Sequence, residues 1–188
     1  MKNLSVAFLR VSLLSAVLVL AACGTGHGTL TPNLKEPKES RVAITTLESR
    51  SNSTTTGSAT FTESDDKVTL ELEVSGATPG LHGAHIHQTG DCSAADAASA
   101  GGHWNPATVT HGPADPGHHL GDLGNIEIGQ DGKGTLTVTK AAWKIGDGSP
   151  QDVVGKALVI HGGQDDLVTD PAGNSGSRVA CGVITGKK

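Results

Sequence analysis

The sequence predicts an all-β protein, a sandwich or barrel of short strands, and three observations favour this class. Glycine is abundant at 26 of 188 residues while Phe, Trp and Tyr together number four, so we expect many turns around a core of Val, Leu, Ile and Ala. Alternation over residues 67–74 places Val68, Leu70, Leu72 and Val74 on one face of a half-buried antiparallel strand. No segment has the apolar periodicity of a convincing amphipathic helix.

Eight strands are expected, with turn-forming residues between them. In chain order they cover residues 42–45, 57–62, 67–74, 83–87, 125–128, 134–139, 157–161 and 179–184. Residues 91–121 and 162–178 show no periodicity. Unstructured segments of this length inside a domain call for an explanation, either function or disorder.

The first 22 residues have the parts of an export signal: basic residues, the apolar run 11–20 and a small-residue end. The run is too short to span a membrane comfortably. It ends in Leu-Ala-Ala-Cys at residues 20–23, which resembles the lipobox of bacterial lipoproteins. The resemblance implies that residues 1–22 are removed and that Cys23 becomes a lipidated N-terminus held to the membrane. A plain secreted protein with a chance cysteine is the alternative.

Residues 24–40 contain almost no apolar side chains, so we expect a flexible tether. The folded domain is expected over residues 41–188, in the cell envelope, on its periplasmic or otherwise extracytoplasmic side. In such an oxidising place the two remaining cysteines, Cys92 and Cys181, most often form a disulfide. Two free thiols are the alternative.

Histidine is concentrated in one part of the chain, since eight of nine lie between Leu81 and His161. His85 and His87 flank Ile86 in a predicted strand, so both imidazoles project from one face while Ile86 points into the core. Two exposed histidines on a strand are the alternative. Further candidate ligands follow at His103, His111, His118, His119, Asp122 and His161. Imidazole suits zinc and copper, whereas calcium and iron–sulfur clusters need other ligands.

Five separated segments resemble the copper/zinc superoxide dismutase family, in that family's order. They are Gly-Ala-His-Ile-His at 83–87, Gly-His-Trp-Asn-Pro at 102–106, His-Leu-Gly-Asp-Leu-Gly-Asn at 119–125, Ala-Leu-Val-Ile-His at 157–161 and Gly-Ser-Arg-Val-Ala-Cys-Gly-Val-Ile at 176–184. The similarity runs from residue 41 to the C-terminus, and the short gap between His87 and Cys92 is similar to the exported bacterial branch. The resemblance implies a Greek-key, immunoglobulin-like antiparallel barrel or sandwich with two long functional loops.

The resemblance also implies an enzyme that disproportionates superoxide to dioxygen and hydrogen peroxide with a copper ion and a zinc ion. The implied copper ligands are His85, His87, His103 and His161. The implied zinc ligands are His103, which bridges the two metals, and His111, His119 and Asp122.

Other positions carry over with distinct roles. Asp165 matches the aspartate that accepts hydrogen bonds from one histidine of each ligand set, and such partners orient the rings. Arg178 matches the arginine above the copper, and Cys92 with Cys181 match the family's disulfide. The implied catalytic residues are Arg178, which attracts superoxide, and His103, whose copper-side nitrogen supplies a proton.

Three features depart from the pattern. His118 adjoins His119, so either could be the zinc ligand, although the three-residue spacing to Asp122 favours His119. His82 and His27 match no family role and are expected on the surface and in the tether. The loop 162–178 carries three aspartates and no lysine, so attraction of the anionic substrate rests on Arg178 and the metal.

The composition and the candidate ligands limit the kinds of partner that we expect. The formal charge of −5 gives no reason to expect nucleic acid, which calls for a basic face. The expected partners are superoxide and, through Cys23, a membrane, while the family includes both monomers and homodimers. One alternative is a non-enzymatic copper-binding or copper-delivering envelope protein, which would lack a ligand or the arginine; another is a zinc-only structural domain, which would not need four copper-type histidines.

Overall fold

The computed structural model describes residues 40–187. The predicted export signal, Cys23, His27 and nearly all of the predicted tether lie outside these residues. Within the described range, no helix is long and apolar enough to cross a membrane.

The described chain is built from β-strands, and its one helical element is a turn of 3-10 helix at Ala98–Ala100 (η1). The strands are β1 Val42–Ser49, β2 Thr56–Ser64, β3 Lys67–Ser75, β4 Gly80–His87, β5 Asp122–Ile128, β6 Lys133–Lys140, β7 Ala157–His161, β8 Arg178–Val183 and β9 Thr185–Gly186. All eight predicted strands are confirmed, although β4 and β5 begin earlier than predicted. The two-residue β9 is too short to leave a pattern in the sequence.

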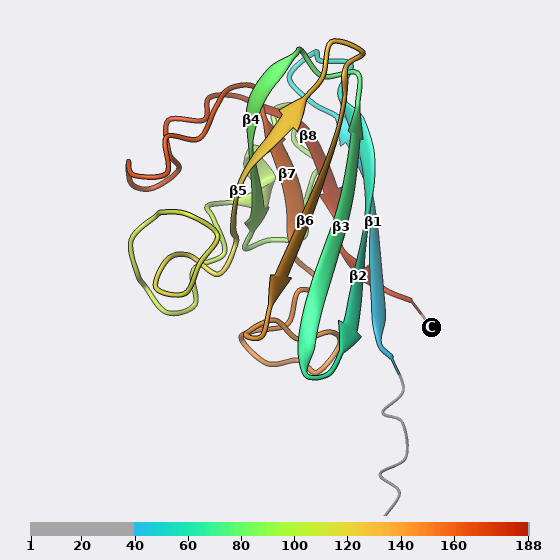
Figure 1. Ribbon diagram of the computed structural model, residues 1–188, viewed down its shortest axis with the longest axis vertical. Helices are drawn as coiled ribbons and strands as arrows, with labels where there is room; N and C mark the ends of the chain where they lie inside the picture. Colours follow the sequence, from blue (N-terminus) through green and yellow to red (C-terminus); the bar gives the residue numbers. More distant parts are fainter. Residues whose placement is uncertain (1–39, 188) are drawn as a thin grey trace, which may run out of the picture. The chain divides into compact units, whose positions relative to one another are not determined.

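The strands form one antiparallel sheet that curls into a near-closed barrel (Figure 1). Eight of them follow in the order β5-β4-β7-β8-β1-β2-β3-β6, and β9 pairs with β1 outside this path. The strands at the two ends of this order, β5 and β6, are consecutive in the chain and joined by a tight turn, in which the Gly129 N–H donates to the Lys133 carbonyl at 2.8 Å. Neighbours that are distant in the chain, such as β4 with β7 and β3 with β6, reflect Greek-key crossovers.

The core follows the alternation visible in the sequence. The apolar residues of 67–74 are all at most 1 % exposed. The expectation of a purely aliphatic core is wrong, because Phe61, Trp104 and Trp143 are also buried in it, and the rings of Phe61 and Trp143 meet edge to face. Aromatic side chains bury more area than aliphatic ones, so a few of them contribute a large share of a core.

Two long loops, residues 88–121 and 162–177, leave the barrel beside β4, β5 and β7 (Figure 1). The first loop is tied to β4 at Ile86, whose carbonyl accepts the Trp104 N–H at 2.9 Å and whose N–H donates to the Gly121 carbonyl at 2.8 Å. A Cβ atom at Gly121 would collide with the Ile86 carbonyl oxygen, so this close approach requires glycine.

The predicted disulfide between Cys92 and Cys181 is confirmed, with the Cα atoms 5.8 Å apart. It joins the 88–121 loop to β8. Both cysteines belong to a small apolar cluster that includes Ala97, Ala100, Ala157 and Val159. A covalent link and apolar packing therefore hold the beginning of this loop on the sheet.

Candidate metal centre

Strand β4 positions the first two candidate ligands. His85 and His87 are 0 % and 1 % exposed, and Ile86 between them is buried in the core. The alternative of two exposed histidines is wrong because both long loops fold over this face of the strand. The His85 ring donates to Asp165 in one loop, and the His87 ring donates to the Gly101 carbonyl in the other.

A first group of four buried histidines has its potential ligand atoms within 4.8 Å of one another. It consists of His85, His87, His103 and His161, the residues predicted to bind copper. A single β-bridge between His87 and His103 brings the loop residue to β4. His161 is the last residue of β7, which pairs with β4, so the barrel itself sets the separation of the remaining rings.

In a second group, three histidine nitrogens converge on one carboxylate oxygen. The group consists of His103, His111, His119 and Asp122, the residues predicted to bind zinc. From Asp122 Oδ1 the distances are 2.9 Å to His103 Nδ1, 3.1 Å to His111 Nδ1 and 3.3 Å to His119 Nδ1. Three imidazoles and one carboxylate form a ligand set that suits tetrahedral zinc.

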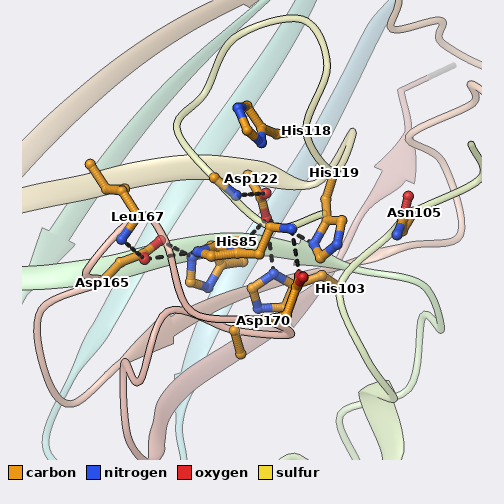
Figure 2. A network of polar contacts seen from close by, with 12 residues as sticks. His85, His103, Asn105, His118, His119, Asp122, Asp165, Leu167 and Asp170 are labelled. Atoms are coloured by element: carbon orange, nitrogen blue, oxygen red, sulfur yellow. Dashed lines mark hydrogen bonds and ion pairs between the residues drawn. The ribbon is translucent and has the colours of Figure 1, made fainter. Parts of the chain in front are cut away.

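The two groups are connected in two ways. His103 belongs to both of them, with Nδ1 facing Asp122. In addition, Asp165 joins the groups from outside. Figure 2 shows it beside His85, whose Nε2 lies 2.8 Å from Asp165 Oδ2. The other oxygen, Oδ1, lies 2.9 Å from His111 Nε2. Asp165 is fully buried, so its carboxylate fixes one ring of each group.

Some ring nitrogens in the two groups are buried yet have no hydrogen-bond partner among residues 40–187. They are Nδ1 of His85, His111 and His119 and Nε2 of His87, His103 and His161. Buried polar atoms are almost always satisfied, so this concentration of exceptions indicates ligand atoms. In His85, His87, His111 and His161 the other nitrogen faces an oxygen acceptor, which leaves a lone pair on the unpartnered nitrogen. The residues therefore fit copper and zinc.

Burial keeps most of these imidazoles neutral, the form that binds a metal. It lowers the pKa of His87 to about 2 and the pKa of His161 to about 4. Burial, followed by the neighbouring imidazoles, holds the pKa of His85 well below its usual value. His111 differs, because its hydrogen bond to Asp165 and the nearby carboxylate charges outweigh burial and raise its pKa.

Two residues that the sequence-based prediction missed hold these groups from outside. The Asn125 amide donates to the Asp165 carbonyl at 2.9 Å and accepts the Asp165 N–H at 2.8 Å. The Asp170 carboxylate accepts the His111 N–H at 2.6 Å. Asn125 lies in one of the five segments that resemble the family, so its role could have been recognised from the sequence. The role of Asp170 could not, because a carboxylate that binds a backbone N–H leaves no pattern in the sequence.

The structure separates His119 from its neighbour His118. The His119 ring belongs to the second group, whereas the His118 side chain is 30 % exposed and has Nε2 3.5 Å from Asp115 Oδ1. His118 lies outside both groups.

The expectation that His82 lies on the surface is wrong. His82 is buried, with Nδ1 2.7 Å from the His161 carbonyl and Nε2 2.8 Å from the Thr78 carbonyl. The reason is that β4 begins at Gly80, so His82 is a sheet residue paired with Ile126. Its ring supports the backbone of a residue in the first group.

Arg178 begins β8, and its guanidinium is held by the 88–121 loop. Nη1 donates to the Ala97 carbonyl and Nη2 to the Gly101 carbonyl, each at 2.7 Å. Burial lowers the pKa of Arg178, but a guanidinium remains charged at neutral pH. Since Gly101 also binds the His87 ring, a fixed positive charge lies one carbonyl away from the first group.

Comparison with known proteins gives a consistent result. The family model described as copper/zinc superoxide dismutase matches residues 55–184. A curated relative, the extracellular copper/zinc superoxide dismutase of Brugia pahangi, is 38 % identical over 170 residues, which cover 84 % of this chain and 83 % of the relative. The family match spans β2 to β8, and therefore all residues of both groups.

Proposed function

The chain belongs to the copper/zinc superoxide dismutase family, and from this premise we propose how its residues divide the work of disproportionating superoxide to dioxygen and hydrogen peroxide. The main observation in support is that two buried groups of candidate ligands share His103. A non-enzymatic copper protein would lack a ligand or Arg178, and this chain lacks neither.

Bound copper would supply reversible one-electron chemistry, and bound zinc, which does not change oxidation state, would keep its ligands oriented. Copper would be held by His85, His87, His103 and His161, whose unpartnered nitrogens are Nδ1 in His85 and Nε2 in the other three. Zinc would be held by His103, His111, His119 and Asp122. Nδ1 of His111 and of His119 is without a hydrogen-bond partner among residues 40–187, whereas His103 Nδ1 and Asp122 Oδ1 contact each other at 2.9 Å.

His103 is the residue to which we assign the supply of a proton. Its Nδ1 faces the Asp122 carboxylate at 2.9 Å, so the ring stays fixed, while the buried Nε2 could hold a proton whenever it is not bound to copper. Hydrogen peroxide needs two protons, and a positioned imidazole is a common proton donor near neutral pH. The buried position of Nε2 in the first group supports this role.

Arg178 is the residue to which we assign attraction of the substrate. The chain has a formal charge of −5, so the field that guides a small anion must be local. The 162–177 loop contains no lysine or arginine, while the Arg178 guanidinium is held beside the first group by two carbonyls. Local positive potential raises the encounter rate of an anion, an effect for which this family is a known example.

For the rest of the chain, we propose that residues 1–22 are an export signal, that Cys23 carries a lipid and that residues 24–40 tether the domain 41–188 to a membrane of the cell envelope. The Leu-Ala-Ala-Cys ending supports this proposal. The Cys92–Cys181 disulfide supports an oxidising compartment, and the matched relative is named extracellular. Superoxide crosses membranes poorly, so the enzyme would protect the envelope.

Fatty-acid labelling tests the anchor. Cys23→Ser is expected to lose the label and to move from the membrane to the soluble fraction, while the double variant Cys92→Ser, Cys181→Ser keeps the label. Persistence of the label in Cys23→Ser would contradict the anchor. Sedimentation of the soluble variant then shows whether this chain forms a homodimer, as some members of the family do.

Metal content tests the ligand assignment. His161→Ala is expected to lose copper and retain zinc, and His119→Ala is expected to lose zinc and retain copper. His118→Ala, the matched control for His119, keeps both metals. Loss of zinc from His118→Ala but not from His119→Ala would overturn the assignment.

A further inference from the structure

We propose that Ser51, in the turn between β1 and β2, is a positioning residue for the guanidinium of Arg178. This inference rests on the role proposed above for Arg178. The evidence for it is a set of hydrogen bonds made by residues outside both ligand groups.

Arg178 is held in two places, and its side chain spans the distance between them. Its backbone opens β8, while its guanidinium donates to the Ala97 and Gly101 carbonyls of the 88–121 loop. The position of the positive charge therefore depends on how this loop segment lies relative to β8.

Ser51 binds both parts. Its Oγ donates to the Arg178 carbonyl at 2.9 Å, and its N–H donates to the Ala95 carbonyl at 2.8 Å. Ala95 lies two residues before Ala97, which accepts the guanidinium. One residue thus connects the backbone of Arg178 with the loop segment that receives its side chain.

The turn around Ser51 is itself firmly attached. The Arg50 N–H donates to the Val179 carbonyl and its Nε donates to the Cys92 carbonyl, both at 2.8 Å. Ser51 and Asn52 have φ values of 53° and 57°, which non-glycine residues seldom adopt. These contacts keep Ser51 in a conformation in which both of its hydrogen bonds form.

The disulfide joins the same two elements but does not replace Ser51. Its β8 end is Cys181, three residues beyond Arg178, and its loop end is Cys92, five residues before Ala97. Ala95 lies between Cys92 and Ala97 in the sequence, and Ser51 connects this part of the loop to β8 separately from the disulfide.

The first test compares Ser51→Ala with Ser53→Ala. Ser51→Ala removes the Oγ contact with Arg178 and keeps the N–H contact with Ala95. Ser53→Ala removes a bond to the next residue of β8, from Ser53 Oγ to the Val179 carbonyl at 2.5 Å, and a bond from the Thr55 N–H to Ser53 Oγ at 3.2 Å, but no contact of Arg178. Ser51→Gly, which suits a positive φ, provides a second variant that folds without strain in the turn.

We expect both Ser51 variants to lower the rate of superoxide consumption about two- to fivefold, as loss of one hydrogen bond would, at unchanged copper and zinc content. Ser53→Ala should keep the wild-type rate. In an Arg178→Ala background, Ser51→Ala should have no further effect on the rate, because its effect passes through Arg178. An equal loss in both backgrounds would overturn the proposal.

A second readout does not depend on activity. Exchange of the Arg178 guanidinium protons, followed by NMR in the metal-free, disulfide-intact protein, should be faster in Ser51→Ala than in the wild type and in Ser53→Ala. Unchanged exchange would overturn the positioning role. If Arg178→Ala leaves the rate unchanged, the role proposed for Arg178 fails, while the exchange rates still decide whether Ser51 holds the guanidinium.

Discussion

His87 and Arg178 donate to the same oxygen atom. His87 Nδ1 lies 2.9 Å and Arg178 Nη2 lies 2.7 Å from the Gly101 carbonyl oxygen. Because Nδ1 donates there, His87 has Nε2 left as its metal-binding nitrogen. One backbone carbonyl therefore fixes both the tautomer of a proposed copper ligand and the position of the charge to which we assign attraction of the substrate.

Replacing Arg178 by alanine should lower the rate of superoxide consumption by roughly 3- to 10-fold, the size expected for losing a charged contact. It should also flatten the dependence of this rate on ionic strength between about 0.01 and about 0.15 M, because screening then has less local charge to weaken. The matched control is Arg41→Ala, since Arg41 is exposed and, within residues 40–187, its side chain donates to the Ile145 carbonyl and belongs to neither ligand group. Equal salt dependence in the two variants would refute the role of Arg178.

Asp165→Asn should weaken zinc binding by about 10- to 100-fold. His85 and His111 contact different oxygens of Asp165, and in asparagine one of these becomes an NH2 donor, so one of the two rings loses its acceptor. Competition with a chelator measures the affinity. The control is Asp166→Asn, because Asp166 is exposed and the side-chain partners described for it, Val168, Thr169 and Asn174, lie in its own loop. Wild-type affinity in Asp165→Asn would show that the His111 ring is held by other contacts.

The barrel and the His85–His87 pair could be predicted because they leave periodic patterns in the sequence, whereas the complete ligand groups followed from the resemblance of five segments to a known family. Alternation over 67–74 reports a buried face directly, and His85 with His87 on one strand fall on the same side for the same geometric reason. The burial of His82 could not be predicted, because it depends on where β4 begins.

Hydrogen bonds between side chains and the backbone also could not be predicted. Asp170 binds the His111 N–H, and Ser51 binds the Arg178 carbonyl. Any residue type carries these backbone groups, so the partner cannot be identified before the loops are placed. The aromatic members of the core were missed for a different reason. The low abundance of Phe and Trp does not say where in the fold the few of them lie.

Acid should destabilise the metal-free protein. His87 and His161 have folded-state pKa values of about 2 and about 4, below the ordinary 6.5, so the unfolded chain binds more protons below pH 6.5. Their contribution to stability is present above about pH 6.5 and is lost as the pH falls toward 4 and below, by up to about 1.4 kcal/mol per pH unit for each histidine.

Urea unfolding from about pH 7 to about pH 5 measures this slope. The double variant His87→Gln, His161→Gln should show a shallower dependence on pH. A wild-type free energy of unfolding that stays constant or rises toward pH 5 would contradict the neutral, buried state of these rings.

Removing the disulfide with Cys92→Ser and Cys181→Ser should lower the free energy of unfolding by about 2–5 kcal/mol. The bridge closes a long loop, because its cysteines are separated by 89 positions in the sequence, and both cysteines are buried. Urea unfolding with and without reductant provides the check: reductant should destabilise the wild type and leave the double variant unaffected. A reductant-insensitive wild type would mean that the bridge contributes little.

The most direct test of the central claim is the rate of superoxide consumption by the copper- and zinc-loaded protein, measured beside His161→Ala and His118→Ala. We expect fast turnover from the wild type and from His118→Ala. Removal of an outer partner of a ligand costs about 10- to 100-fold, and we expect a larger loss of rate from His161→Ala, which removes a ligand itself. Stoichiometric copper binding without turnover in the wild type, or full activity in His161→Ala, would contradict this claim.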